Sequence, residues 1–254
     1  MTTPVRHIVL HNHLFKNAGT SVDRILQQNF TGRWHTAEFP TNRGGNTAGV
    51  SKWIEETPNG IAFSSHTMLG PLPRPAGIRI IPLILLRDPV DRIASAYRFE
   101  RAQDAQTQGA ILAKKHGFAG YVHARLSLSG DRQCRNFQTS RLAAMRPDVK
   151  GSERERACAA ALMVAGQGVL GLVRAFDSAM QRLTDLMLPH HPGFSWQPVT
   201  ENASGKRASE FVSPEMRALI EEHNRDDIAL LSYASALLRQ AETVDRRLQA
   251  VGIA

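Results

Sequence analysis

The sequence is poor in cysteine, in aromatic residues and in long apolar runs. Its two cysteines, Cys134 and Cys158, form no C-x-x-C pair, which excludes a disulfide framework and gives no sign of a zinc site. Aromatic residues make up 6% of the chain and are scattered, which argues against a stacking surface for nucleic acid. No apolar run reaches about eighteen residues and no signal-peptide pattern opens the chain, so we expect no membrane span and a soluble cytoplasmic protein.

The rest of the composition is that of a globular domain with an excess of positive charge. Its 254 residues can bury a sizeable core, and 42% hydrophobic with 21% charged residues rules out wholesale disorder. A net charge of +8 favours an anionic ligand, which could be a nucleotide, nucleic acid, an acidic glycan or a membrane surface. A solvated basic surface explains the same excess without any ligand.

The most informative stretch is residues 8–26, which pass from a strand pattern through a short polar loop into a helix pattern. The loop contains Lys16, Gly19, Thr20 and Ser21, and we call residues 16–21 the anion loop. The first turn of a helix leaves backbone N–H groups unpaired, and its dipole favours negative charge. Because Lys16 precedes Gly19, the loop is not a Walker P-loop, and we expect it to bind a phosphate-like group in another way.

Apolar and β-branched runs predict buried strands over residues 8–15, 61–64, 78–86 and 169–173. A helix is expected after the anion loop, and a second begins at Asp88 as N-cap with Pro89 at the first helical position. Three more are expected over residues 153–164, over 177–188 with Asp177 as N-cap, and from Ser213 through about 238. Strands that alternate with helices predict an α/β fold with a central parallel sheet flanked by helices.

Polar segments interrupt this alternation. Residues 41–50 and 189–207 are expected to be loops, and residues 52–57 a short helix. Residues 101–132 are polar and helical in tendency, with a break near Gly117 and Gly120. We therefore expect a single domain over residues 1–254, with an inserted helical subregion at about 101–165.

Three chemical groups follow predicted strands: the anion loop, His66 and Arg87. The carboxyl ends of parallel strands share one edge of the sheet, where ligands bind, so these groups are expected to converge. Arg87 at the end of a buried strand needs an anionic partner, either a structural carboxylate or a ligand phosphate. Ser95, about two helical turns further on, could share that partner.

Two segments carry a resemblance to a known family. LFKNAGTSVDRIL and LILLRDPVDRIASAYRFER resemble the sulfotransferases that use 3′-phosphoadenosine 5′-phosphosulfate (PAPS), in the branch of heparan 2-O-sulfotransferases and bacterial carbohydrate sulfotransferase-like proteins. Weaker similarity extends from FSSHTMLG through NFQTSRLAA and LVRAFDSAM to PVTENASGKRAS. The resemblance implies a P-loop-like sulfotransferase fold and transfer of a sulfuryl group to a hydroxyl, most naturally on a carbohydrate, without a metal.

The resemblance also implies roles for individual residues. The 5′-phosphosulfate would be bound by the loop residues Lys16, Asn17, Ala18, Gly19, Thr20 and Ser21, with Lys16 stabilising charge on the leaving phosphate. Arg87 and Ser95 would hold the 3′-phosphate, His66 would be the general base, and Lys206 and Arg207 would close over the nucleotide.

The sequence departs from the family pattern at several of these positions. Asn17 and Ala18 replace Thr-Gly, and Ser65 replaces the glycine before the histidine. Ser140 replaces an arginine, with Arg141 one place later, so Arg141 receives no role.

Other interpretations stay open at this point. The chain could be a P-loop-like nucleotide or small-molecule kinase, or a polyanion-binding module without catalysis. His66 could be a satisfied buried histidine, and Lys206 and Arg207 a basic loop. His11 and His13 share a strand face, but no third metal ligand is evident nearby, so packing in the core or on the acceptor side is expected of them. The acceptor, the sulfated position and the oligomeric state are not predicted.

Overall fold

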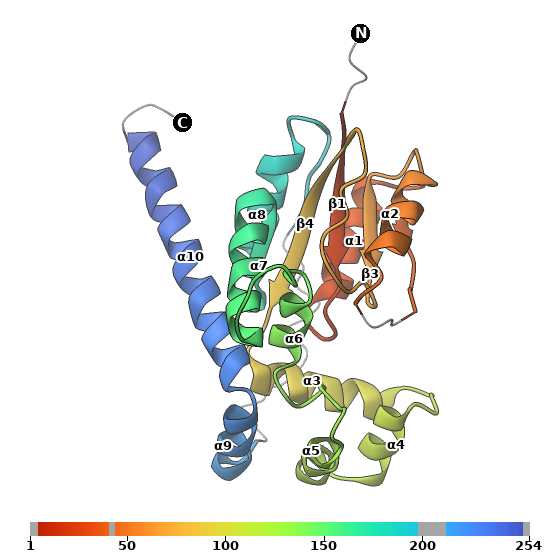
Figure 1. The fold of residues 1–254 in the computed structure, drawn as a ribbon, viewed down its shortest axis with the longest axis vertical. Helices are drawn as coiled ribbons and strands as arrows, with labels where there is room; N and C mark the ends of the chain where they lie inside the picture. The colour runs from red at the N-terminus through yellow and green to blue at the C-terminus, as the bar shows by residue number, and fades with distance from the viewer. Residues whose placement is uncertain (1–4, 41–43, 198–211, 251–254) are drawn as a thin grey trace.

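A computed structural model describes residues 5–40, 44–197 and 212–250 (Figure 1). The chain forms an α/β structure around a five-stranded parallel sheet of order β2-β3-β1-β4-β5, which confirms the predicted fold class. The strands are β1 (Arg6–Asn12), β2 (Trp34–Thr36), β3 (Ala62–Ser65), β4 (Ile78–Leu86) and β5 (Val169–Leu172).

The central strand β1 pairs with β3 on one side and β4 on the other. Its last residue, Asn12, lies opposite Ser65, the last residue of β3. The segments that follow β1 and β3 therefore leave the sheet side by side. The order of the strands reverses around β1, and such a point in an open parallel sheet forms a crevice at the carboxyl ends.

Alternating residues of the strands build a core on each face of the sheet. On one face Val9, Leu83 and Leu85 pack against α1 (Gly19–Asn29) and α8 (Phe176–Met187). On the other face Ile8 and Leu10 pack against α2, while Ile84 and Leu86 pack against α6 and α7. The bounds of these helices are α2 (Thr47–Glu55), α6 (Phe137–Ala143) and α7 (Glu153–Gln167). Both faces of the sheet are thus covered, as an interior parallel sheet requires.

The remaining helices lie beyond the carboxyl ends of the strands or along the side of the molecule (Figure 1). We call α3 (Pro89–Ala102), α4 (Gln108–Lys115), α5 (Phe118–Ser127) and α9 (Pro214–His223) the helical lobe; its core contains Ile93, Tyr121 and Ile220. The long α10 (Arg225–Ala250) packs on α7. The expected helical subregion is therefore divided, since α4 and α5 belong to the lobe whereas α6 and α7 cover the sheet.

Several predicted boundaries were wrong. The first strand ends at Asn12 instead of residue 15, because the chain turns there and the Asn17 N–H bonds to the Leu14 carbonyl. Helix α2 begins at Thr47, inside the expected loop, because its Val50 and Ile54 pack on the sheet. Asp177 lies in the first turn of α8 and is not its N-cap, since a short 3₁₀ turn precedes the helix.

Other boundaries agree in part. Asp88 caps α3 through hydrogen bonds from the N–H groups of Val90 and Asp91, as predicted. Gly117 marks the expected break before α5, but Gly120 lies inside that helix. The helical region after Ser213 is two helices, α9 and α10, separated at Asn224. None of the described helices is long and apolar enough to cross a membrane.

Candidate functional site

A cavity of about 320 Å³ opens at the carboxyl ends of β1, β3 and β4, between the sheet and helix α3 of the lobe. It is lined by His13, Phe15, Lys16, Ala18, Gly19, Thr20, Ser21, His66, Arg87, Ser95, Arg98, Phe99 and Val173. The structure thus brings together the anion loop, His66, Arg87 and Ser95, which the sequence placed at one edge of the sheet. No carboxylate lies among these described lining residues.

The anion loop has an unusual backbone. Lys16 and Ala18 adopt left-handed conformations with φ of 63° and 60°. Such conformations cost about 1–3 kcal/mol at a residue other than glycine, and they cluster at ligand sites. In the described part of the chain the N–H groups of Ser21 and Val22 bond to the Ala18 carbonyl, whereas those of Gly19 and Thr20 have no protein partner. These two N–H groups lie at the positive end of the α1 dipole, where an anion is favoured.

Asn17 does not line the cavity. Its buried side chain donates to the Leu85 carbonyl and to Oε1 of Gln138, both at 2.7 Å, and its backbone N–H bonds to Leu14. Gln138 also joins the end of β4, because it accepts from the Arg87 N–H and donates to the Arg87 carbonyl, both at 2.8 Å. Asn17 and Gln138 therefore fix the anion loop against the end of β4.

Arg87 is half-buried at the end of β4, and one of its guanidinium nitrogens donates to the Lys16 carbonyl at 3.0 Å. Burial lowers the pKa of Arg87, while Asp91 and the nearby arginines have smaller effects. In the described chain no carboxylate lies within ion-pair distance of its guanidinium, so the structural alternative raised by the sequence is not met. The hydroxyl of Ser95 lines the same cavity from α3.

Lys16 is one of three cations that line the cavity, together with Arg87 and Arg98. Its Nζ is 4.4 Å from the centre of the Phe99 ring, a cation–π contact. Burial, together with the charges of Arg87 and Arg98, lowers the pKa of Lys16. An anion in the cavity would relieve this repulsion between like charges. Arg98 was missed by the sequence reading, although it stands three residues after Ser95 and so shares its side of α3.

His66 follows β3, with its side chain 52% exposed at the mouth of the cavity. Its Nδ1 donates to the Glu38 carboxylate at 2.7 Å, which leaves Nε2 as the basic nitrogen. Burial would raise the pKa of Glu38, but hydrogen bonds from Thr67 and His66 hold it below its ordinary value. His66 is therefore not the satisfied buried histidine that the sequence left open.

Arg141 supports the segment that carries His66. Its guanidinium donates to the carbonyls of His66 and Met68, at 2.9 and 2.7 Å. Burial lowers the pKa of Arg141. The residue therefore positions the turn after β3 and does not line the cavity.

A group of buried polar side chains lies behind the anion loop. The Nδ1 atoms of His11 and His13 lie 2.8 and 2.9 Å from the two carboxylate oxygens of Asp23. The ligand atoms of these three residues lie within 4.8 Å of one another, so Asp23 is a third potential ligand that the sequence reading missed. Each Nδ1 already has the carboxylate as its hydrogen-bond partner, so the group is complete as a hydrogen-bonded cluster.

Two predicted nucleotide-binding residues lie outside the described part of the chain. They are Lys206 and Arg207, at the end of the expected loop over residues 189–207. Their role stays a prediction. Glu38 and Asp23 carried no signal in the sequence. Glu38 meets His66 because β2 pairs with β3, and Asp23 meets His11 and His13 because α1 packs on the sheet.

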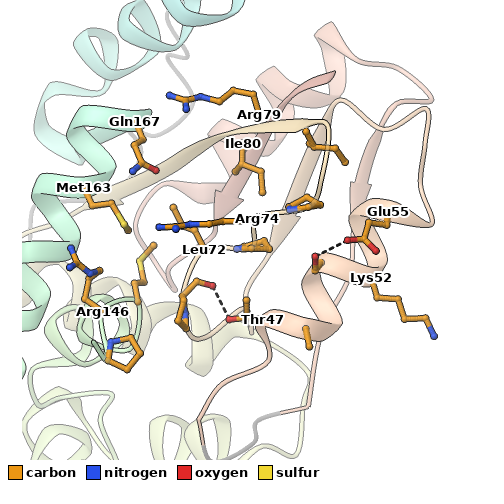
Figure 2. Close-up of a pocket in the computed structure, with 18 of the residues that line it drawn as sticks. Thr47, Lys52, Glu55, Leu72, Arg74, Arg79, Ile80, Arg146, Met163 and Gln167 are labelled. Atoms are coloured by element: carbon orange, nitrogen blue, oxygen red, sulfur yellow. Dashed lines mark hydrogen bonds between the residues drawn. The ribbon is translucent and has the colours of Figure 1, made fainter. Parts of the chain in front are cut away.

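A larger groove of about 1320 Å³ lies on the other side of the sheet, beside the amino-terminal half of β4 (Figure 2). Figure 2 shows Thr47 and Glu55 of α2 on one side, Gln167 of α7 on the other, and Arg74 between them. None of the described residues that line it is a histidine or a cysteine, and its cations share the groove with the carboxylates of Glu55 and Asp148. The smaller cavity is therefore the better candidate for a catalytic site.

Comparison with known proteins gives one informative match. No protein-family model matches the chain. The chain is 36% identical over 206 residues to a protein of Archaeoglobus fulgidus described as an uncharacterized protein, and the match covers 78% of this chain and 79% of the archaeal one.

Proposed function

The chain belongs to the same family as this archaeal protein, and we propose its function from the geometry of the cavity. The protein is a PAPS-dependent sulfotransferase that transfers a sulfuryl group to the hydroxyl of an acceptor, of which a carbohydrate is the class we favour. The observation that carries the proposal is Arg87, a half-buried cation that has no carboxylate within ion-pair distance among the described residues and that lines the same cavity as the anion loop.

The residues present fit a donor that has phosphates at both ends of its nucleoside. The N–H groups of Gly19 and Thr20, with Lys16 and the Ser21 hydroxyl, suit the phosphosulfate end. Arg87 and Ser95, which line the cavity from the end of β4 and from α3, suit the 3′-phosphate. The sequence resemblance assigns the same residues to the same two ends. Asn17 is better assigned to positioning the loop, since its donors are already used.

The donor, when bound, supplies a sulfuryl group on a good leaving phosphate. His66 accepts the proton of the acceptor hydroxyl at Nε2, while Glu38 holds Nδ1–H and stabilises the imidazolium. The acceptor oxygen forms the new S–O bond as the S–O bond to phosphate breaks, with its electron pair passing to the phosphate. Lys16 places a positive charge beside that phosphate.

The test is transfer of ³⁵S from labelled PAPS to a panel of glycan and small-molecule hydroxyls in the presence of EDTA. We expect labelled product with the wild type, and a loss of about 10²–10⁴-fold in turnover with His66→Ala, because a general base contributes about that factor. The affinity of His66→Ala for the nucleotide should be close to that of the wild type.

Glu38→Gln is the matched control, since it keeps the hydrogen bond to His66 but removes the charge, and it should lose less than His66→Ala. Wild-type turnover in His66→Ala would contradict the role of the base. Mg²⁺-dependent phosphoryl transfer from labelled ATP to the same panel would instead show that the protein is a kinase. A cytoplasmic location stays a prediction.

A further inference from the structure

The cluster behind the anion loop contains a second histidine–carboxylate pair that the proposed chemistry does not use. Nδ1 of His13 lies 2.9 Å from Oδ2 of Asp23, while Nδ1 of His11 and the Ser64 hydroxyl bond to Oδ1 at 2.8 and 2.6 Å. Burial alone would raise the pKa of Asp23, but these hydrogen bonds and the neighbouring histidine hold it well below its ordinary value. Asp23 therefore stays ionised, and both imidazoles donate to it from Nδ1.

His13 differs from His11 in the surroundings of its Nε2 edge. The side chain of His13 is 9% exposed and lines the cavity, whereas that of His11 is 2% exposed and does not. A Cβ atom added to Gly19 would lie 2.0 Å from Cδ2 and 2.1 Å from Nε2 of His13. The Nε2 edge of the ring therefore lies directly against the start of α1, where the N–H groups of Gly19 and Thr20 have no partner among the described residues.

The two histidines of the cavity also touch each other. The rings of His13 and His66 lie 3.9 Å apart between centres. The side chain of His66 is 52% exposed, whereas that of His13 is 9% exposed and lies against the anion loop.

We propose that His13 is an anion ligand of this cavity: as an imidazolium held by Asp23, it donates a hydrogen bond from Nε2 to the oxygens of the group bound at the start of α1. The identity of that group as a phosphosulfate rests on the proposed function, but the contact itself requires only a tetrahedral dianion. Asp23 accepts the Nδ1–H of His13 and so holds the ring with its Nε2 edge toward the start of α1.

This role couples anion binding to a proton. Because Nδ1 already donates to Asp23, Nε2 can donate only from the doubly protonated ring, so affinity for the anion falls as the pH rises. Several charged and titratable groups surround His13. They are His11 from β1, Asp23 from α1, Lys16 from the anion loop, His66 after β3, Glu38 after β2, Arg87 after β4 and Arg98 from α3. Two of these groups, His11 and His66, are also histidines, so a variant of His66 serves as a control.

The experiment is calorimetric titration with inorganic sulfate, whose own charge stays constant, at about pH 6 and about pH 8.5, on either side of the ordinary range of histidine. Wild-type affinity should be about tenfold lower at the higher pH, the effect expected for one hydrogen bond to a charged group. His13→Gln should bind at the lower pH about as weakly as the wild type does at the higher pH, and its affinity should not change with pH.

His66→Gln should keep the pH dependence, and His123→Gln, at an exposed position, is the matched control for loss of a histidine. If His13→Gln does not fold, ¹⁵N NMR of the wild-type histidines gives the second readout, since sulfate should move the Nε2 signal of His13. A His13→Gln protein that binds sulfate like the wild type, while Lys16→Ala does not, would overturn this inference and leave the proposed donor site standing. A wild type that binds neither sulfate nor the nucleotide would overturn both.

Discussion

Arg87 shows at the scale of one residue how a side chain can indicate the chemistry of its ligand. A guanidinium is always charged, so half-burying it without a carboxylate costs free energy unless another partner compensates. The Lys16 carbonyl accepts one of its five possible hydrogen bonds. A ligand phosphate is the partner that best completes the site, since arginine binds phosphate in a bidentate manner.

We predict that Arg87→Ala lowers affinity for 3′-phosphoadenosine 5′-phosphate by about 10- to 100-fold, the range for a lost hydrogen bond to a charged group. Affinity for AMP, which has no 3′-phosphate, should barely change. Calorimetric titration measures both. Arg79→Ala is the matched control, because Arg79 is exposed near the other end of the same strand. An equal loss for the two nucleotides would mean that Arg87 does not read the 3′-phosphate.

The anion loop is an element whose shape depends on a residue outside it. Gly19 has no positive φ, so its backbone would accept alanine. The space that a Cβ would need is filled by the ring of His13, which Asp23 holds in place. Glycine is thus required here by the close approach of the imidazole.

We predict that Gly19→Ala displaces either the His13 ring or the start of α1, and weakens sulfate binding at least about tenfold, the loss expected when a hydrogen bond to a charged group is broken. The double variant His13→Ala with Gly19→Ala should fold as well as His13→Ala alone, because the clash has gone. A double-mutant cycle in urea unfolding measures this coupling. Additive effects would show that the ring does not restrict Gly19.

The sequence predicted the long elements and the edge where they converge, because these depend on local patterns. The buried run of β4, the Asp88–Pro89 helix start and the strand–loop–helix around Gly19 all have strong local signals. Strand β2 was missed because it has three residues. Asn224 separates α9 from α10 through hydrogen bonds with Asn136 and Cys134, partners about ninety residues away that no local pattern reveals.

Some residues of the candidate site could be predicted from local patterns and others could not. Lys16, His66 and Arg87 follow recognisable strands, so their convergence could be predicted. Asp23 and Glu38 could not, since each meets its histidine through contacts between separate segments. His13 was expected to pack in the core or on the acceptor side, because nothing in the sequence shows that its outer edge reaches the cavity.

At the scale of the whole molecule, the cavity exists because the helical lobe closes against the carboxyl edge of the sheet (Figure 1). A buried ionic network fixes α5 to α3 inside the lobe. Arg125 pairs with Glu100 at 2.7 Å and with Asp131 at 2.6 Å, and the Tyr121 hydroxyl also donates to Glu100. Because α3 carries Ser95 and Arg98, this network also maintains one wall of the cavity.

We predict that Arg125→Met lowers the free energy of unfolding by about 3–5 kcal/mol, because it leaves two buried carboxylates without their cation. Arg132→Met is the control, since its pair with Glu153 is largely exposed and should be worth at most about 1 kcal/mol. Urea unfolding followed by circular dichroism measures both. Similar losses for the two variants would show that the buried network does not hold the lobe.

The proposed function requires the cavity to bind a nucleotide with phosphates on both its 3′ and 5′ positions. Calorimetric titration of the wild type with 3′-phosphoadenosine 5′-phosphate, with AMP and with ATP plus Mg²⁺ tests it most directly. We predict tight binding of the first ligand, weak binding of AMP and no requirement for a metal. Binding of ATP with Mg²⁺ alone, or of none of the three, would contradict the claim.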